Sequence, residues 1–363
     1  MKLAPEIRDR LARMLHLRTG DLGPGDPIPE PLVSASIYQL PDEPRPDRTY
    51  GRTANPTVQA VEARLAILED APTKLFASGM AAYSALFHAT LKAGDRLLLL
   101  SDGYYSVRHY LDQFLSGFGV ELVTCPAKEF AEKSLDGFRL AVIESPTNPR
   151  LDIIDIAAAA TRAREAGCLL AVDNSVCTPV LQQPLDLGAD IVLAADTKAT
   201  SGHSDVLTGH VSSRDEELMA RVHSARTLAG GIAGPFEAWL MLRGLETLDV
   251  RLQRMCANAE SVAEILASHP AVGEFLYPDG THPQMAHPGT LIGATFADKP
   301  TAERFIELTE LFVPTTSFGG VHSAADRRAR WGDDVPEGFL RLSIGCEPTE
   351  VLVEAVRGAL DRL

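Results

Sequence analysis

Short apolar runs alternate with longer helical patterns across residues 57–195. The apolar runs, which predict strands, cover residues 73–78, 96–100, 120–125, 139–145, 168–174 and 190–195. The segments between them, in which apolar residues recur at helical spacing, cover residues 57–70, 79–94, 104–119 and 153–167. Strands that alternate with helices predict an α/β fold, with a mostly parallel sheet covered on both faces.

The pattern changes near residue 250. A long helical segment is followed there by predicted strands and helices that no longer alternate one by one. The predicted helices cover residues 250–269, 301–312 and 349–363, and the predicted strands cover residues 272–278, 291–297 and 339–345. This arrangement is typical of a smaller α+β domain.

Residues 20–47 are rich in proline and have little helical periodicity, so they predict an extended arm of the kind that can embrace a partner subunit. We therefore expect an N-terminal arm over residues 1–47 and a large domain over residues 48–226. A small C-terminal domain with its linking helix is expected over residues 227–363.

Composition and charge exclude several classes of protein. The chain has 363 residues, and 34 basic against 49 acidic side chains give a formal charge of −15. This charge repels nucleic acid and anionic membranes, and no apolar stretch reaches the roughly 18 residues of a spanning helix. The five cysteines form no C-x-x-C pair, so neither a disulfide framework nor a zinc site is indicated. We expect a cytoplasmic protein without a metal.

Two residues point to a particular cofactor. Asp173 ends one predicted strand, and Lys198 follows the next predicted strand, so both should reach the crevice at the carboxyl edge of the sheet. Pyridoxal 5′-phosphate (PLP) needs a lysine amine for a Schiff base and a carboxylate that keeps its ring nitrogen protonated. Lysines are usually solvated surface residues, and Lys198 alone would carry little weight.

Further motifs offer groups for a phosphate. In S-G-M-A-A at residues 78–82 a strand ends and a helix begins, and the N–H groups of a helix N-terminus bind phosphate. Gly79 would let the backbone approach closely, although such turns are often only structural. Tyr50 and Arg52 would add a hydroxyl and a guanidinium, or they could form an ordinary surface contact.

Seven motifs, taken in order, resemble the PLP enzymes of cysteine and methionine metabolism. They are YGRTANPT, SGMAA, the tyrosine of SDGYY, ESPTNP, VDN, TKATSGHSD and RLSIG. The resemblance extends from about residue 30 to the end of the chain. The family includes cystathionine γ-lyase, cystathionine γ-synthase, cystathionine β-lyase and methionine γ-lyase, and the sequence most resembles bacterial cystathionine γ-lyases. The resemblance implies an aspartate aminotransferase-like fold (fold type I).

The resemblance also implies roles for the residues that hold the cofactor. Lys198 would be the Schiff-base lysine, Asp173 the partner of the ring nitrogen, and Tyr104 a ring-stacking residue that can exchange protons. The backbone of Gly79 and Met80, together with Thr197, would hold the phosphate. In this family Tyr50 and Arg52 reach the cofactor of the neighbouring subunit, which implies a homo-oligomer, usually a tetramer built from two dimers.

The substrate carboxylate has expected partners as well. Arg341, in a predicted strand, would clamp it with Ser317 beside it, and Asn148 would bind both the ring oxygen and this carboxylate. An arginine in an apolar strand can instead extend its charged end to water. His322 has two interpretations, a residue on the substrate side or a structural histidine in a loop.

The sequence departs from the family pattern at several positions. Ala195 replaces a phosphate-binding serine, and Ser204 or solvent would have to compensate. Ser106 stands where methionine γ-lyases have cysteine, which disfavours that activity. Thr49 and His322 replace two acidic residues that commonly meet the distal ammonium group of cystathionine.

We expect an α,γ-elimination that converts cystathionine to cysteine, 2-oxobutanoate and ammonia. The alternatives are γ-replacement on an activated homoserine, as in cystathionine γ-synthase, and the cystathionine β-lyase and methionine γ-lyase reactions. A PLP-binding regulator without catalysis would not need the carboxylate clamp. A nicotinamide-dependent dehydrogenase is disfavoured because no G-x-G-x-x-G follows the first predicted strand.

Overall fold

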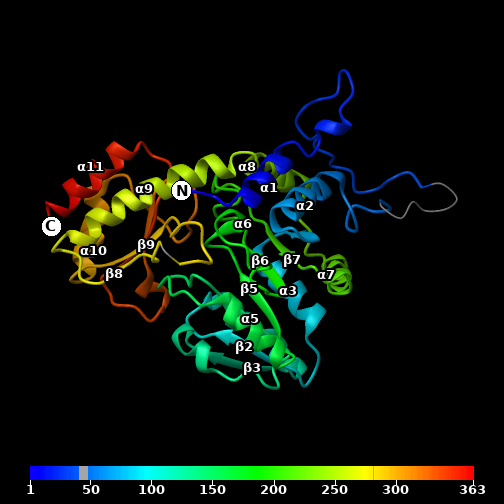
Figure 1. Cartoon of the computed structure of the whole chain (residues 1–363), viewed down its shortest axis with the longest axis horizontal. Coiled ribbons are helices and arrows are strands. Elements are labelled where there is room, and N and C mark those ends of the chain that lie inside the picture. The colour runs from blue at the N-terminus through cyan, green and yellow to red at the C-terminus, as the bar shows by residue number, and fades with distance from the viewer. Residues whose placement is uncertain (41–47, 281) are drawn as a thin grey trace.

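The computed structural model describes residues 1–40, 48–280 and 282–363, and it contains a large and a small sheet (Figure 1). The large sheet has the strand order β1-β7-β6-β5-β4-β2-β3. Its strands are β1 (Thr73–Phe76), β2 (Arg96–Leu100), β3 (Glu121–Cys125), β4 (Leu140–Glu144), β5 (Leu169–Asp173), β6 (Ile191–Ala194) and β7 (Gly209–Ser212). Among the described strands of this sheet, β7 alone runs opposite to the others, so the sheet is mostly parallel, as predicted.

Alternate residues of the parallel strands bury opposite faces of the large sheet. In β2, Leu97 and Leu99 pack toward α3 (Gly79–Thr90), α4 (Tyr105–Tyr110) and α7 (Glu216–Ala229). Leu98 and Leu100 pack toward the opposite layer, which contains α5 (Ile156–Glu165) and the 3-10 helix Ala127–Glu132. This two-residue alternation explains why the strands read as continuous apolar runs.

Several elements differ from their predicted form. Residues 104–119 are not one regular helix, because α4 is followed by the π-helical turn Leu111–Leu115 and the 3-10 turn Ser116–Phe118. Strand β7 was not predicted, since only Val211 among its four residues is a strongly apolar strand former. A short helix, α6 (Thr178–Leu181), follows β5 in the chain.

The small sheet belongs to the C-terminal part of the chain. Its strand order is β10-β11-β12-β9-β8. The strands are β8 (Phe275–Leu276), β9 (Leu291–Thr295), β10 (Val313–Pro314), β11 (Ala324–Arg327) and β12 (Phe339–Ser343). The helices α9 (Leu248–Ser268), α10 (Lys299–Thr309) and α11 (Thr349–Leu360) share one apolar core with it. The smaller α+β unit is therefore confirmed, although β10 and β11 were not predicted.

Helix α9 joins the two apolar cores (Figure 1). Its first half, with Leu248 and Leu252, packs with α1 (Pro5–Leu15), α2 (Pro56–Glu69) and α8 (Pro235–Leu245). Its second half, with Val262 and Leu266, packs with the small sheet. The division of the chain at residue 226 stays a prediction.

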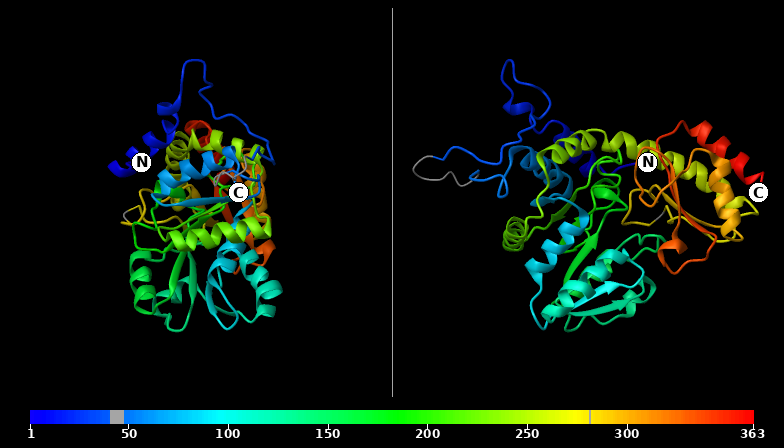
Figure 2. Two further views of the ribbon diagram at one scale, coloured as in Figure 1. Left: turned by 90° about the vertical axis from the view of Figure 1, so that its right-hand side faces the viewer. Right: turned by 180° about the vertical axis from the view of Figure 1, so that it is seen from behind.

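The N-terminal region has a packed part and a projecting part. Helix α1 buries Ile7, Leu11 and Met14 in the core that it shares with α2. The following residues up to 40 include the 3-10 turn Thr19–Asp21 and project from the body on both sides of a contact (Figures 1 and 2). At this contact Trp239 Nε1 donates to the Glu30 carbonyl at 3.1 Å, and the Val33 N–H donates to the Thr57 hydroxyl at 2.9 Å. Residues 41–47 of the expected arm lie outside the described residues. In the C-terminal part of the chain, the 3-10 turn Arg328–Trp331 follows β11.

No helix within the described part of the chain is long and apolar enough to cross a membrane.

Candidate active site

A cavity of about 350 Å³ opens where the carboxyl ends of β4 and β5 meet the N-terminus of α3. Its volume lies in the range of about 300–1,000 Å³ that is common for small-molecule sites. The polar and charged residues that line it are Ser78, Tyr83, Tyr104, Tyr105, Glu144, Asn148, Asp173, Ser175, Thr197, Lys198, Thr316, Ser317, Arg328 and Arg341.

Lys198 projects into this cavity from the segment that follows β6. Its Nζ lies 3.0 Å from the Ser317 hydroxyl and 4.8 Å from the centre of the Phe318 ring. Burial and the nearby Arg341 lower the pKa of the Lys198 ammonium to about 8, although Asp173 opposes this shift. An amine with this pKa is neutral often enough near pH 8 to act as a nucleophile or a base.

Asp173 lies at the carboxyl end of β5 on the lining of the same cavity. Its Oδ2 accepts a hydrogen bond of 2.7 Å from the Tyr83 hydroxyl, and its Oδ1 accepts one of 2.9 Å from the Ser175 N–H. Burial raises the pKa of Asp173, while these donors and Lys198 oppose the rise. The donors favour a carboxylate that stays charged in a buried place.

Tyr83 and Ser175 were missed in the sequence, although both lie next to recognised motifs. Tyr83 directly follows the S-G-M-A-A motif on α3, and Ser175 directly follows V-D-N. The signal that could have found Tyr83 is its helical spacing of four residues from Gly79, which places both on related faces of α3.

The N-terminus of α3 faces the cavity at the expected phosphate position. Ser78 caps this helix by accepting the Ala81 N–H at 3.1 Å, and Gly79, Met80 and Thr197 line the cavity beside it. A side chain at Gly79 would bring its Cβ to 2.8 Å from the Ala195 Cβ. The glycine is therefore required by close packing against the residue that follows β6.

The replacement at Ala195 leaves other hydroxyl groups near this position. Ser204 does not line the cavity of Lys198, whereas Ser78 and Ser175 do. The Ser175 hydroxyl accepts the Ala195 N–H at 2.7 Å. Ser78 and Ser175 are thus closer candidates than Ser204 for the contact that a serine at residue 195 would make.

Arg341 enters the cavity from β12 of the small sheet. Its guanidinium donates to Asn148 Oδ1 at 2.7 Å and to the Ser317 carbonyl at 3.1 Å, and Asp326 lies 3.5 Å away. Burial lowers the pKa of Arg341 to about 10, and its Nε has no hydrogen-bond partner. A buried guanidinium with a free N–H can bind a carboxylate.

Tyr104 and His322 occupy more open positions. Tyr104 lines the cavity at the start of α4, and 42% of its surface is exposed. His322 is exposed and lines an adjacent cavity of about 610 Å³ instead. The two cavities share the residues Thr197, Leu207, Ser317 and Phe318.

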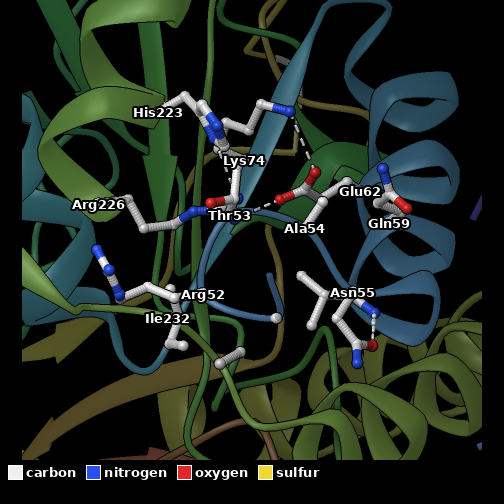
Figure 3. Close-up of a pocket in the computed structure, with 13 residues that line it drawn as sticks. Arg52, Thr53, Ala54, Asn55, Gln59, Glu62, Lys74, His223, Arg226 and Ile232 are labelled. Atoms are coloured by element: carbon white, nitrogen blue, oxygen red, sulfur yellow. Dashed lines mark hydrogen bonds and ion pairs between the residues drawn. The ribbon is translucent and has the colours of Figure 1, made fainter. Parts of the chain in front are cut away.

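Tyr50 and Arg52 do not line the cavity of Lys198 in this chain. Arg52 lies in a separate cavity, where its Nη1 donates to the Thr227 carbonyl at 2.8 Å. Figure 3 shows this cavity of Arg52, in which Glu62 lies between Lys74 and Arg226. Tyr50 is 46% exposed, with the Arg52 guanidinium 5.5 Å from its ring.

The residues around Lys198 fit PLP. An amine of lowered pKa, a hydrogen-bonded carboxylate and the N-terminus of a twelve-residue helix share one cavity. These are the groups that an aldehyde, a ring nitrogen and a phosphate require. Among the described residues, no group of three or more His, Cys, Asp or Glu side chains could hold a metal ion.

Comparisons with known proteins agree with this donor set. Residues 26–361 match the family described as Cys/Met metabolism PLP-dependent enzyme. A putative cystathionine gamma-lyase of Streptomyces coelicolor is 42% identical over 92% of this chain and 91% of its own length.

Two solved structures are also similar. A cystathionine gamma synthase of Xanthomonas oryzae pv. oryzae in complex with cystathionine has a TM-score of 0.92 and 30% identity, covering 97% of this chain and 98% of its own. An apo methionine gamma lyase of Micromonospora echinospora has a TM-score of 0.89 and 35% identity, and the match covers 96% of this chain and 98% of the lyase chain.

Proposed function

Because this chain belongs to the family of Cys/Met metabolism PLP-dependent enzymes, we propose that it catalyses α,γ-elimination of cystathionine. The chain is a PLP-dependent enzyme of trans-sulfuration, and its relatives include γ-lyases, γ-synthases and β-lyases that act on carbon–sulfur bonds. The observation that carries the proposal is the single cavity that contains Lys198, Asp173 and Arg341.

PLP, when bound, supplies an electron sink for negative charge that develops at the substrate Cα. Lys198 would hold the cofactor aldehyde at rest and then remove the Cα proton, since its lowered pKa keeps part of the amine neutral. Asp173 would hold the ring nitrogen protonated, with its own charge stabilised by Tyr83 and Ser175.

The clamp would orient the substrate. Arg341, with Asn148 and Ser317 around it, would bind the substrate carboxylate. Loss of a second proton, from the substrate Cβ, would supply the electron pair that expels the thiolate from Cγ. Tyr104 would stack on the cofactor ring and protonate this departing thiolate. Addition of water and loss of ammonia then leave cysteine and 2-oxobutanoate as products.

The distal half of the substrate would extend into the adjacent cavity. This cavity joins the cavity of Lys198 through Thr197 and Ser317, and it contains Asp205 and His322. An exposed acid and a histidine are suited to the ammonium and carboxylate groups of a distal amino acid. This assignment favours a substrate-side role for His322 over a purely structural one.

We also propose that the active site is shared between two subunits. The cavity of Lys198 lacks Tyr50 and Arg52, which in a dimer would reach the cofactor phosphate of the neighbouring subunit. The projecting N-terminal segment exposes Ile28 and Ile37, each more than 70% accessible, which supports its burial against another copy of the chain.

The activity is tested by incubating the purified holoenzyme with cystathionine, homocysteine, methionine and O-activated homoserines, and by identifying the keto acid by mass. We expect 2-oxobutanoate and cysteine from cystathionine. Pyruvate as the main product would establish β-elimination, and net formation of cystathionine from an activated homoserine and cysteine, without cystathionine cleavage, would establish γ-replacement.

The matched control is Lys198→Ala. This variant should lose both turnover and the visible absorbance of the bound cofactor, because no other amine lines the cavity among the described residues. Retained absorbance in Lys198→Ala would show that a different lysine holds the aldehyde.

A further inference from the structure

A second carboxyl group, that of Glu144, lies beside Asp173. Glu144 ends β4 and pairs in register with Asp173, which ends the neighbouring parallel strand β5. It is 7% exposed and lines the cavity of Lys198. Neighbouring parallel strands are roughly 4.8 Å apart, so the two side chains leave the same edge of the sheet together.

The two carboxyl groups have unequal hydrogen-bond partners. Both oxygens of Asp173 accept hydrogen bonds, one from Tyr83 and one from the Ser175 N–H. Oε2 of Glu144 is buried and has no partner, and a Cβ added to Gly103 would lie only 3.4 Å from it. A charged carboxylate with one buried oxygen that lacks a donor is costly, and a second negative charge beside Asp173 is disfavoured.

We propose that Glu144 is a positioning residue that carries the one proton of this carboxyl pair, so that the negative charge stays on Asp173. This inference rests on the role proposed above for Asp173 as the partner of the cofactor ring nitrogen. A charged Glu144 would compete with Asp173 for that ring nitrogen, and it would also repel the Asp173 carboxylate. A neutral Glu144 leaves a single, fixed anion at this end of the cavity.

The surroundings of Glu144 favour the neutral form. Burial and the charge of Asp173 raise the pKa of Glu144 well above its usual range, although the backbone N–H groups of Asn148 and Tyr104 oppose the rise. The titratable and charged groups that face this region are Tyr83 on α3, Asp102 and Tyr104 after β2, Arg108 on α4, Asp173 on β5, Lys198 after β6, Arg328 after β11 and Arg341 on β12.

None of the described cations forms an ion pair with Glu144. Arg108, which lines a small cavity together with Glu144, donates instead to the carbonyls of Leu100 and Gly103, at 3.2 and 2.6 Å. Arg341 is engaged by Asn148 and Asp326. Both arginines therefore have closer partners of their own, and Lys198 and Arg341 act on Glu144 through their charges without a direct ion pair among the described residues.

The same carboxyl group connects two loops of the site. Its backbone partners, Asn148 and Tyr104, are the proposed ligand of the ring oxygen and the proposed stacking residue. A neutral acceptor at residue 144 is enough to hold both loops, because a carbonyl oxygen accepts N–H donors without carrying a full charge. Substitutions at residue 144 can therefore test separately whether the acceptor atom is needed and whether it must be uncharged.

Two variants test the acceptor and its charge separately, and the readout is the PLP dissociation constant of each apoprotein. Glu144→Gln keeps a neutral acceptor, so its dissociation constant at neutral pH should stay within about threefold of that of the wild type. Glu144→Ala removes the acceptor and should weaken PLP binding about tenfold or more. Circular dichroism checks that each variant is folded.

The inference is overturned if Glu144→Gln weakens PLP binding as much as Glu144→Ala, because the negative charge would then be needed. It is also overturned if Glu144→Ala binds PLP as tightly as the wild type, because residue 144 would then position nothing. Infrared difference spectra of wild type against Glu144→Gln decide independently, since the holoenzyme should show a protonated carboxyl stretch at neutral pH rather than a carboxylate band.

Asp173→Asn tests the underlying function in the same assay. This variant should weaken PLP binding about tenfold or more, whatever the result at residue 144. Wild-type affinity in Asp173→Asn would remove the proposed role of Asp173. A loss there, together with a charge requirement at residue 144, would refute only the inference on Glu144.

Discussion

Single side chains of the cavity depend on neighbours that do not themselves react. Asp173 is buried at the end of β5, and its ionised form is stabilised by a hydroxyl and a backbone N–H rather than by a direct ion pair. Hydrogen bonds to charged groups contribute about 1.5–3 kcal/mol each. The charge at Asp173, and with it the electronic state of the bound cofactor, should therefore respond to changes at Tyr83.

Tyr83→Phe is expected to weaken PLP binding and to lower kcat by roughly 10- to 100-fold, because it removes one of the hydrogen-bond donors to Asp173. The measurement is the PLP dissociation constant of the apoprotein together with steady-state turnover. Tyr110→Phe is the matched control, since its hydroxyl contacts Ser84 outside the cavity. Equal behaviour of the two variants would contradict the role given to Tyr83.

At the scale of elements, the cavity depends on how closely β7 approaches the start of α3. A Cβ on Gly209 would lie 2.7 Å from the Gly79 Cα and 2.8 Å from the Ala194 carbonyl oxygen. These neighbours are backbone atoms, which cannot move aside as a flexible side chain can. Two glycines thus allow the helix that faces the phosphate position to pack directly on the sheet.

Gly209→Ala should lower the free energy of unfolding by about 1–3 kcal/mol, because the added methyl overlaps backbone atoms. Urea denaturation of the apoprotein measures this loss. Gly358→Ala is the matched control, because Gly358 lies in α11 with no atom within 4 Å of an added Cβ. That control should gain about 0.5–1 kcal/mol from helix propensity, and a destabilised control would invalidate the comparison.

A buried histidine joins β7 to two other elements. His210 contacts Asp196 at 2.9 Å through Nδ1 and Glu69, on α2, at 3.1 Å through Nε2. Although burial opposes the charge, Asp196 and Glu69 raise the pKa of His210 to about 10. Asp196 lies two residues before Lys198, so the triad anchors the segment that carries Lys198.

This triad predicts a pH dependence of stability. The pKa of His210 is raised on folding from about 6.5, so its contribution is complete below that pH and is lost as the pH rises toward about 10. Wild-type stability in urea should therefore fall over this interval relative to His210→Gln. If the difference between the two proteins does not shrink with rising pH, His210 is not charged in the native state.

At the scale of the whole molecule, the separation of Arg52 from Lys198 has a consequence for assembly. The two residues lie in different cavities of one chain, while the proposed function places Arg52 on the cofactor phosphate. Only a second copy of the chain could then bring an Arg52 to each Lys198. The exposed apolar residues of the N-terminal segment provide surface for such an association.

Subunit complementation tests this arrangement. Lys198→Ala and Arg52→Ala should each have little activity alone. After unfolding and refolding together, a mixed dimer contains one site with both native residues, so activity should return. A mixture that stays as inactive as its components, despite mixed dimers seen by native mass spectrometry, would show that Arg52 serves its own subunit.

The sequence could predict most of this fold for a physical reason. Strands buried on both faces must be continuously apolar, and the six predicted strands of the large sheet correspond to β1–β6. Strand β7 and the π-helical turn after α4 were not predicted. The four residues of β7 mix polar and apolar types, and a single π-helical turn is too short to leave a clear periodicity in the sequence. Their conformation depends on neighbours that are distant in sequence.

The sequence alone determined the α/β architecture and the family, and it predicted that Lys198 and Asp173 reach one cavity, because apolar periodicity and short motifs are local properties of the chain. The tertiary structure decided what surrounds that pair. It placed Tyr83 on Asp173, Glu144 beside it, and Arg52 in another cavity. Hydrogen-bond partners and carboxyl neighbours come from different strands and helices, and their charge state follows from burial that no local pattern records.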